Sequence, residues 1–85
     1  MNNKIYTLSA SLAHPREVFT SAIKNSASSV IIAHNHPSGD AKPSEDDLEI
    51  TERLVKAGNI LGIDVTDHVI VAEGNHFSFK NEGLI

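Results

Sequence analysis

One short run of apolar residues does most to limit the folds that this chain can adopt. Val30-Ile31-Ile32-Ala33 is continuous rather than alternating, and it lies within a segment, residues 28–33, that has the length of a strand. A strand that is apolar on both faces is typical of the buried centre of a sheet. We therefore expect a central strand at residues 28–33.

Strand and helix patterns alternate around this segment. The expected elements are a strand over 4–12, a helix from 14–15 to 25–26, the central strand, a helix over 44–61, a strand over 65–72 and a strand over 76–79. The first is expected at a sheet edge, because Ser and Thr fill its alternate positions. The predicted buried stripes of the two helices are Val18, Phe19, Ala22 and Ile23, and Leu48, Leu54, Val55 and Leu61. This order predicts an α/β layer fold.

The composition limits the class of protein. A chain of 85 residues allows one small domain of marginal stability, and 40% apolar with 5% aromatic residues predicts a core of Ile, Val, Leu and Ala. With no cysteine, the chain has neither disulfides nor a thiolate zinc site. The longest apolar run is too short to cross a membrane, and the N-terminus lacks the apolar core of a signal peptide. We expect a cytoplasmic protein.

Acidic residues concentrate in residues 40–52, where only Lys42 offsets them, and the net charge is −4. A phosphate backbone would be repelled there, which argues against a nucleic-acid-binding face at this segment. Most of the charge run is interpreted as the solvated face of a helix.

The most informative motif follows the central strand. His34-Asn35-His36 is separated by seven residues from Ser44-Glu45-Asp46-Asp47. Two imidazoles and a carboxylate form a ligand set that suits zinc with one open position, where a water can be activated. We expect His34 and His36 just past the carboxyl end of the strand, where sites form in α/β sheets.

The spacing allows these side chains to converge. Residues two apart on an extended segment point the same way, so His34 and His36 can face one ion. Ser44 and Asp47, three apart, can share one side of a helix, with Asp47 as the oxygen ligand and the Ser44 hydroxyl near the water or an oxyanion. Asp40 and Asp46 compete with Asp47 as the ligand, and the spacing from Ser44 favours Asp47.

A structural interpretation competes with the metal site. Ser44-Glu45-Asp46-Asp47 is close to a capping box, with Ser44 as the N-cap and an acid three residues later. Acidic residues also suit the positive end of a helix. The residues alone leave both interpretations open.

The motif resembles the RadC family. His34-Asn35-His36-Pro37-Ser38-Gly39-Asp40 with Pro43-Ser44 and Asp47 carries the likeness, which extends to His14-Pro15-Arg16-Glu17-Val18, Gly62-Ile63 and Asp67-His68, and covers about residues 7–84. RadC proteins belong to the JAMM (MPN-type) metalloprotease superfamily. The resemblance implies a three-layer α/β/α fold with a mixed sheet, similar to cytidine deaminase. It also implies zinc on His34, His36 and Asp47, with Ser44 assisting the water and the oxyanion.

One feature of the JAMM pattern is not found. That pattern uses a glutamate on an earlier strand as general acid and base, whereas Glu17 is the only acid before His34 and reads as part of a helix start. We therefore expect residues 1–85 to be a single RadC-like domain without its N-terminal strands. It would be either the C-terminal part of a longer protein or a truncated domain.

Three functions remain as hypotheses. The first is a zinc metallo-hydrolase acting on an amide bond of an unknown protein or peptide. The second is an inert interaction module that associates with itself or a partner through an open sheet edge. The third, a DNA-associated repair factor, follows only from the family's nominal link to repair, and the net charge counts against it. His-Asn-His is not read as an HNH nuclease motif.

The other histidines are assigned more briefly. His68 either supports the metal ligands or is structural, His14 could help to cap a helix, and His76 is expected on the surface.

Overall fold

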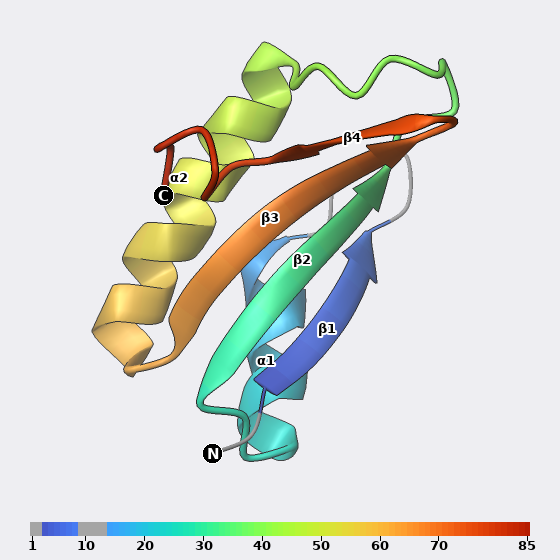
Figure 1. The fold of residues 1–85 in the computed structure, drawn as a ribbon. Coiled ribbons are helices and arrows are strands. Elements are labelled where there is room, and N and C mark those ends of the chain that lie inside the picture. The colour runs from blue at the N-terminus through green and yellow to red at the C-terminus, as the bar shows by residue number, and fades with distance from the viewer. Residues whose placement is uncertain (1–2, 9–13) are drawn as a thin grey trace.

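The computed structural model describes residues 3–8 and 14–85, and its elements follow the expected order. They are β1 (Asn3–Leu8), α1 (Pro15–Lys24), β2 (Ser29–Asn35), α2 (Glu45–Leu61), β3 (Asp64–Ala72) and β4 (Asn75–Ser78) (Figure 1). Residues 9–12 of the expected first strand lie outside the described residues. No helix in the described part of the chain has the length and apolar character needed to cross a membrane.

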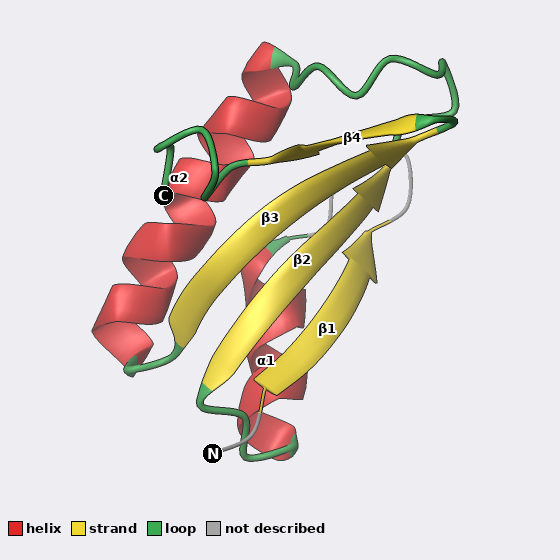
Figure 2. Ribbon diagram, viewed as in Figure 1, coloured by secondary structure: helices red, strands yellow, loops and turns green. Residues whose placement is uncertain are grey.

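The strands form one mixed sheet in the order β1-β2-β3-β4 (Figure 2). β1, β2 and β3 are parallel, and β4 returns antiparallel to β3. The expected α/β class with a mixed sheet is confirmed. β1 lies at an edge and β2 in the interior of the sheet, as their sequences predicted.

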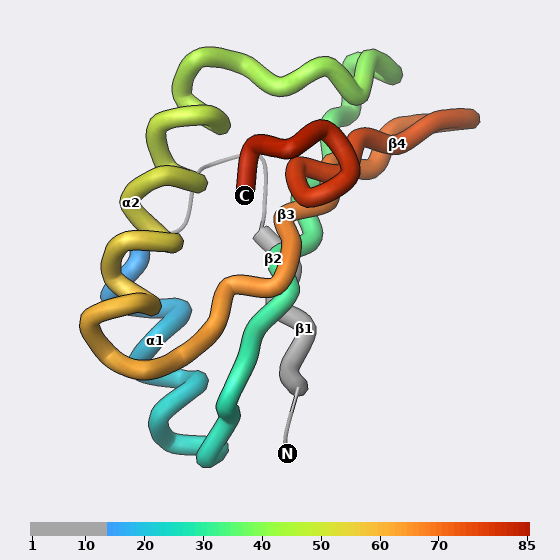
Figure 3. Tube along the Cα trace, turned by 60° about the vertical axis from the view of Figure 1, so that its left-hand side comes forward, coloured from blue at the N-terminus to red at the C-terminus, as the bar shows by residue number. Residues whose placement is uncertain are grey.

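Both helices cover the same face of the sheet, as Figure 3 shows. Right-handed crossovers that step in one direction, from β1 to β2 to β3, place their helices on one side. One core cluster accordingly contains residues of both helices and of β2 and β3, among them Phe19, Leu54, Val30 and Val65. The described residues thus form two layers, and the third layer of the expected α/β/α arrangement is not among them.

The buried stripe of α2 differs from the predicted one. Leu54 is buried as expected, but Leu48 is 42% exposed and Leu61 is 48% exposed. The face that packs on the sheet is made by Asp47, Ile50, Thr51, Leu54 and Gly58. In α1, Ile23 likewise faces solvent. The helix phase is set by which residues meet the sheet, so two polar residues are buried and two leucines are not.

The central strand is longer than its sequence suggested. Pairing continues to Asn35, which is opposite Val71, and the His36 N–H then donates to the Val71 carbonyl at 2.9 Å. His34 is therefore inside β2, and only His36 follows the strand. The expectation that both histidines lie past the strand end was wrong, because partner strands on both sides extend the ladder.

The pairing of β2 with β3 contains an irregularity. Val30 is opposite Val65, but Ile31 is opposite Asp67, so Thr66 is an extra residue in β3. An extra residue of this kind is a β-bulge. Val65 and His68 are both buried as a result, and Asp67 between them is only partly buried.

The end of α2 packs closely against the start of β3 at Gly58. A Cβ atom at this position would lie 2.4 Å from the Ile63 carbonyl oxygen and 3.2 Å from Val65 Cγ2. The backbone oxygen is fixed, because Gly62 ends the helix in the left-handed region and the Ile63 N–H donates back to the Gly58 carbonyl.

We expect Gly58→Ala to lower the free energy of unfolding by about 1–3 kcal/mol, because the new methyl group overpacks this contact. In an open helix the same change would raise stability by roughly 1 kcal/mol. Urea unfolding measures the difference. The control is Asn59→Ala at the exposed neighbouring position, which should leave stability unchanged or slightly raised. A stabilised Gly58→Ala protein would contradict the close packing.

Candidate metal centre

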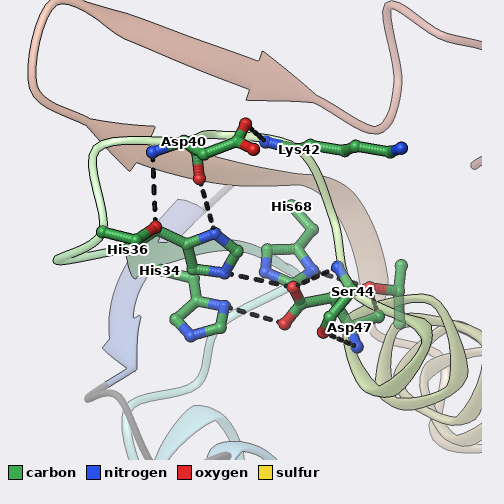
Figure 4. Close-up of polar contacts among 9 residues, drawn as sticks. His34, His36, Asp40, Lys42, Ser44, Asp47 and His68 are labelled. Atoms are coloured by element: carbon green, nitrogen blue, oxygen red, sulfur yellow. Dashed lines mark hydrogen bonds and ion pairs between the residues drawn. The ribbon is translucent and has the colours of Figure 1, made fainter.

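Three side chains meet where β2 ends and α2 begins. His34 Nδ1 lies 3.1 Å from Asp47 Oδ1, and His36 Nε2 lies 3.1 Å from Asp47 Oδ2 (Figure 4). One potential ligand atom from each of the three residues lies within 4.8 Å of the others. The three residues singled out by spacing are therefore close enough to hold a metal ion.

The start of α2 fixes the direction of the Asp47 carboxylate. The Ser44 N–H donates to Asp47 Oδ2 at 2.8 Å, and the Asp47 N–H donates to Ser44 Oγ at 3.1 Å. This is a complete capping box. The helix-start interpretation and the metal interpretation of Ser44 and Asp47 are thus compatible, since the capping box aims the carboxylate at the two histidines.

The loop after β2 fixes the ring of His36. His36 Nδ1 lies 3.0 Å from the Asp40 carbonyl oxygen, which can only accept, so Nδ1 carries the proton. In the neutral ring Nε2 then holds a lone pair, and this is the atom that faces Asp47. A hydrogen bond from the remote nitrogen of a histidine to a carbonyl is the usual way in which a ligating ring is oriented.

This geometry calls for a positive charge between the groups. A neutral His36 places the Nε2 lone pair against a carboxylate oxygen 3.1 Å away, and two acceptors at that distance repel each other. His34 Nδ1 is buried and has no hydrogen-bond partner in the described part of the chain, although Asp47 Oδ1 lies 3.1 Å away. A proton on His36 Nε2 or a bound cation would remove the repulsion between His36 and Asp47.

Burial and neighbouring charges shift two of these groups. Burial lowers the pKa of His34, and His36 beside it acts in the same direction, while Asp47 opposes them. Burial by itself would raise the pKa of Asp47, but the hydrogen bonds from Ser44 and the nearby His34 and His36 hold it below its ordinary value. A neutral imidazole and an ionised carboxylate are the forms that bind metal.

The site opens to solvent through a pocket of about 160 Å³. It is lined by His34, Asn35, His36, Pro37, Ser44, Asp46 and Asp47. Ser44 is exposed at this pocket, and its Oγ accepts from the Asp47 N–H.

The two competing carboxylates, Asp40 and Asp46, do not join the cluster of possible metal ligands. Asp40 Oδ1 accepts from the Lys42 N–H at 2.9 Å, and Asp46 is exposed at the pocket rim without joining the three-residue cluster. Glu17 is exposed in the first turn of α1, as a helix-start residue should be. His14 is the N-cap of α1 but makes no side-chain capping bond, and His76 is exposed as expected.

Two residues near His68 were given no role from the sequence. Thr51 is buried one turn after Asp47, and its hydroxyl lies 2.6 Å from His68 Nδ1. Its four-residue spacing from Asp47 was the available signal. Asp67 joins β3 to β4 and the turn that follows, accepting from Ser78 Oγ at 2.6 Å and from the Lys80 N–H at 2.9 Å.

Comparison with known proteins identifies the family. The RadC-like JAB domain matches residues 3–84 of this chain. This chain belongs to the RadC-like JAB domain family. The RadC resemblance drawn from the motif is thereby confirmed.

Curated relatives agree with this assignment. The chain is 56% identical over 84 residues to a UPF0758 protein of Alkaliphilus oremlandii, covering 99% of this chain and 36% of the relative. It is 60% identical over 79 residues to UPF0758 protein STH371 of Symbiobacterium thermophilum, covering 93% and 34%. For UPF0758 protein Mbar_A2303 of Methanosarcina barkeri the identity is 54% over 81 residues, covering 95% and 35%. The chain spans about a third of the length of these relatives.

His68 makes the metal-free protein sensitive to acid. Burial lowers its pKa from 6.5 to about 4, with His34 acting in the same direction. In the unfolded chain His68 therefore binds a proton near pH 6.5, whereas in the folded protein it does so only near pH 4. The free energy of unfolding falls as the pH drops through this window. The loss amounts to about 3 kcal/mol.

We expect His68→Phe to remove this loss. Urea unfolding with a chelator present, repeated between pH 7 and pH 4, should show the wild-type protein losing about 3 kcal/mol more than the variant. Parallel curves for the two proteins would contradict a buried, neutral His68. His76→Phe, at an exposed position, serves as the control and should follow the wild-type curve.

Proposed function

We propose that this chain is a zinc-binding domain of the metallo-hydrolase class, with His34, His36 and Asp47 as the zinc ligands. The observation that carries the proposal is the pair of close contacts that the histidine nitrogens make with the two oxygens of Asp47, at 3.1 Å each. Membership of the RadC-like JAB domain family supports it.

The donor set fits zinc. Two imidazole nitrogens and one carboxylate oxygen are ligands that zinc accepts, and three protein ligands are typical of a catalytic site with one open position. The buried His34 nitrogen without a hydrogen bond is an atom that a cation would satisfy. When bound, zinc would supply Lewis acidity, which polarises a carbonyl group and lowers the pKa of water.

We propose hydrolysis of an amide bond in a protein or peptide as the reaction. In this assignment the Ser44 hydroxyl donates a hydrogen bond to the oxyanion that develops on the substrate carbonyl, because the hydroxyl lies at the pocket and its oxygen is held by the Asp47 N–H. Asp47 keeps its negative charge through the Ser44 hydrogen bonds, and the Asp40 carbonyl keeps the His36 ring in its orientation.

Turnover also needs a group that carries a proton to the leaving amine. Such general acid–base catalysis typically contributes about 10²–10⁴-fold. Among the residues that line the pocket, Asp46 is exposed on the first turn of α2 and Asp47 is committed to the histidines. We therefore propose that this carrier is a carboxylate outside the three-residue cluster, and that zinc binding by this chain does not depend on it.

Zinc content tests the proposal. Protein purified without a histidine tag should contain close to one zinc per chain after reconstitution, and His34→Ala/His36→Ala should contain little. Elemental analysis of dialysed protein gives the ratio. Affinity should also fall as the pH drops below about 6.5, because protonated imidazoles cannot bind metal.

The matched control is His76→Ala, which removes an exposed histidine of β4 and should leave the zinc content unchanged. Asp47→Asn should weaken zinc binding, while the side-chain oxygen of the asparagine can still accept from the Ser44 N–H. A wild-type protein without zinc after reconstitution, or equal zinc retention at pH 4.5 and pH 7.5, would refute the proposal.

A second candidate function is self-association through β1. This strand is the edge of the sheet and pairs only with β2 among the described elements, so one row of its backbone groups is available to another strand. We propose a homodimer formed by this edge. The domain would then serve as an interaction module whether or not it catalyses hydrolysis.

Sedimentation velocity of the wild-type protein should then show a concentration-dependent dimer. Ile5→Pro and Tyr6→Pro provide a matched pair, because neighbouring N–H groups of a strand point to opposite edges. One variant should keep the fold and lose the dimer, and the other should disrupt pairing with β2. A monomer at every concentration, or a dimer in both proline variants, would exclude the edge as the interface.

A further inference from the structure

His68 is a polar side chain in the middle of the core. It lies on β3, has 0% exposed surface, and stacks on Phe79 with ring centroids 4.6 Å apart and an interplanar angle of 4°. An apolar ring would fill this position without the cost of burying two nitrogen atoms. A buried polar group of this kind needs a reason beyond packing.

The hydrogen bonds of Thr51 determine which nitrogen of His68 carries the proton. The Thr51 hydroxyl lies 2.7 Å from the Asp47 carbonyl oxygen and 2.6 Å from His68 Nδ1. A hydroxyl has one proton, and the carbonyl can only accept, so both contacts are hydrogen bonds only if His68 Nδ1–H donates to Thr51. His68 thus donates to Thr51, and Thr51 donates to the backbone carbonyl of Asp47.

The other contact of the ring is with His34. The two imidazoles are stacked at a centroid distance of 5.8 Å and an angle of 24°. His34 is itself buried, and among the described residues its Nδ1 has no hydrogen-bond partner, although Asp47 Oδ1 lies 3.1 Å away. The plane of its ring is therefore restricted by neighbouring side chains, of which His68 is one.

His68 thus joins two candidate ligands that come from different elements. His34 belongs to β2 and Asp47 to α2. His68 on β3 touches the first through its ring face and the second through Thr51. A metal site needs its ligands held to within roughly 0.5 Å, and supporting side chains on rigid elements provide this precision.

We propose that His68 is a positioning residue for the candidate metal centre, which sets the ring plane of His34 and, through Thr51, the place of Asp47. This inference rests on the proposed zinc site and adds to it a residue that does not itself bind the ion. The role requires a ring for the stack and a donor at the Nδ1 position for Thr51.

Zinc affinity tests the role with variants that separate these two requirements. His68→Phe keeps the ring and removes the donor, His68→Asn keeps a donor near the Nδ1 position and removes the ring, and Thr51→Val removes the hydroxyl. Competition with a chromophoric chelator should show about 10–100-fold weaker zinc binding for His68→Phe and for Thr51→Val. His68→Asn should recover part of the loss, and His76→Phe should bind as the wild-type protein does.

Stability without metal separates positioning from a purely structural role. His68→Phe in the presence of a chelator at pH 7 should unfold at a urea concentration equal to or above that of the wild-type protein, because an apolar ring suits this core. Weakened zinc binding in a protein of undiminished stability supports the proposal. Changed stability with zinc affinity within twofold of wild type overturns it.

The tautomer of His68 gives a readout that needs no metal. Long-range proton–nitrogen correlation spectra of the metal-free protein should show His68 protonated at Nδ1, and the signal pattern should change in Thr51→Val. A ring protonated at Nε2 would overturn the hydrogen-bond chain.

The outcomes also separate this inference from the proposed function. A wild-type protein that binds no zinc refutes the metal centre and the positioning role together. A wild-type protein that binds zinc, with His68→Phe binding equally well, refutes the positioning role alone and leaves the metal centre in place.

Discussion

The reciprocal hydrogen bonds between Ser44 and Asp47 are the interaction on which the rest of the site depends. They satisfy two backbone N–H groups at the start of α2, which would otherwise lack partners in the helix. The same bonds leave both oxygens of Asp47 turned toward the histidines of β2. Helix initiation and carboxylate placement are therefore one event, and a helix starting one residue earlier or later would aim the carboxylate elsewhere.

The polar residues on the buried face of α2 extend this arrangement into the core. Asp47 and Thr51 occupy positions that an ordinary amphipathic helix would give to apolar residues, while Leu48 faces solvent. The helix thus buries less apolar surface than its composition allows. Natural proteins accept such local inconsistencies at functional sites. Gly58, two turns after Thr51, shows the opposite case, because close packing alone excludes a larger residue there.

The sequence predicted those features that depend on residues close together in the chain. The order of the elements, the N-cap at Ser44 and the shared direction of His34 and His36 each depend on residues a few positions apart. The features that could not be predicted from the sequence depend on packing between distant segments. The phase of α2, the extension of β2 through His34 and the contact of Thr51 with His68 are decided by neighbours on other strands, which no periodicity in one segment records.

The extra residue at Thr66 has a consequence for how the core is built. In a regular strand successive side chains alternate, so a buried Val65 would be followed by a buried Asp67 and an outward His68. The irregularity between the Val30 and Ile31 pairs reverses this parity. The Asp67 carboxylate therefore accepts from Ser78 Oγ at the end of β4, and the His68 imidazole is buried in the core. The single extra residue in β3 thus decides that His68, and not the adjacent Asp67, is buried in the core.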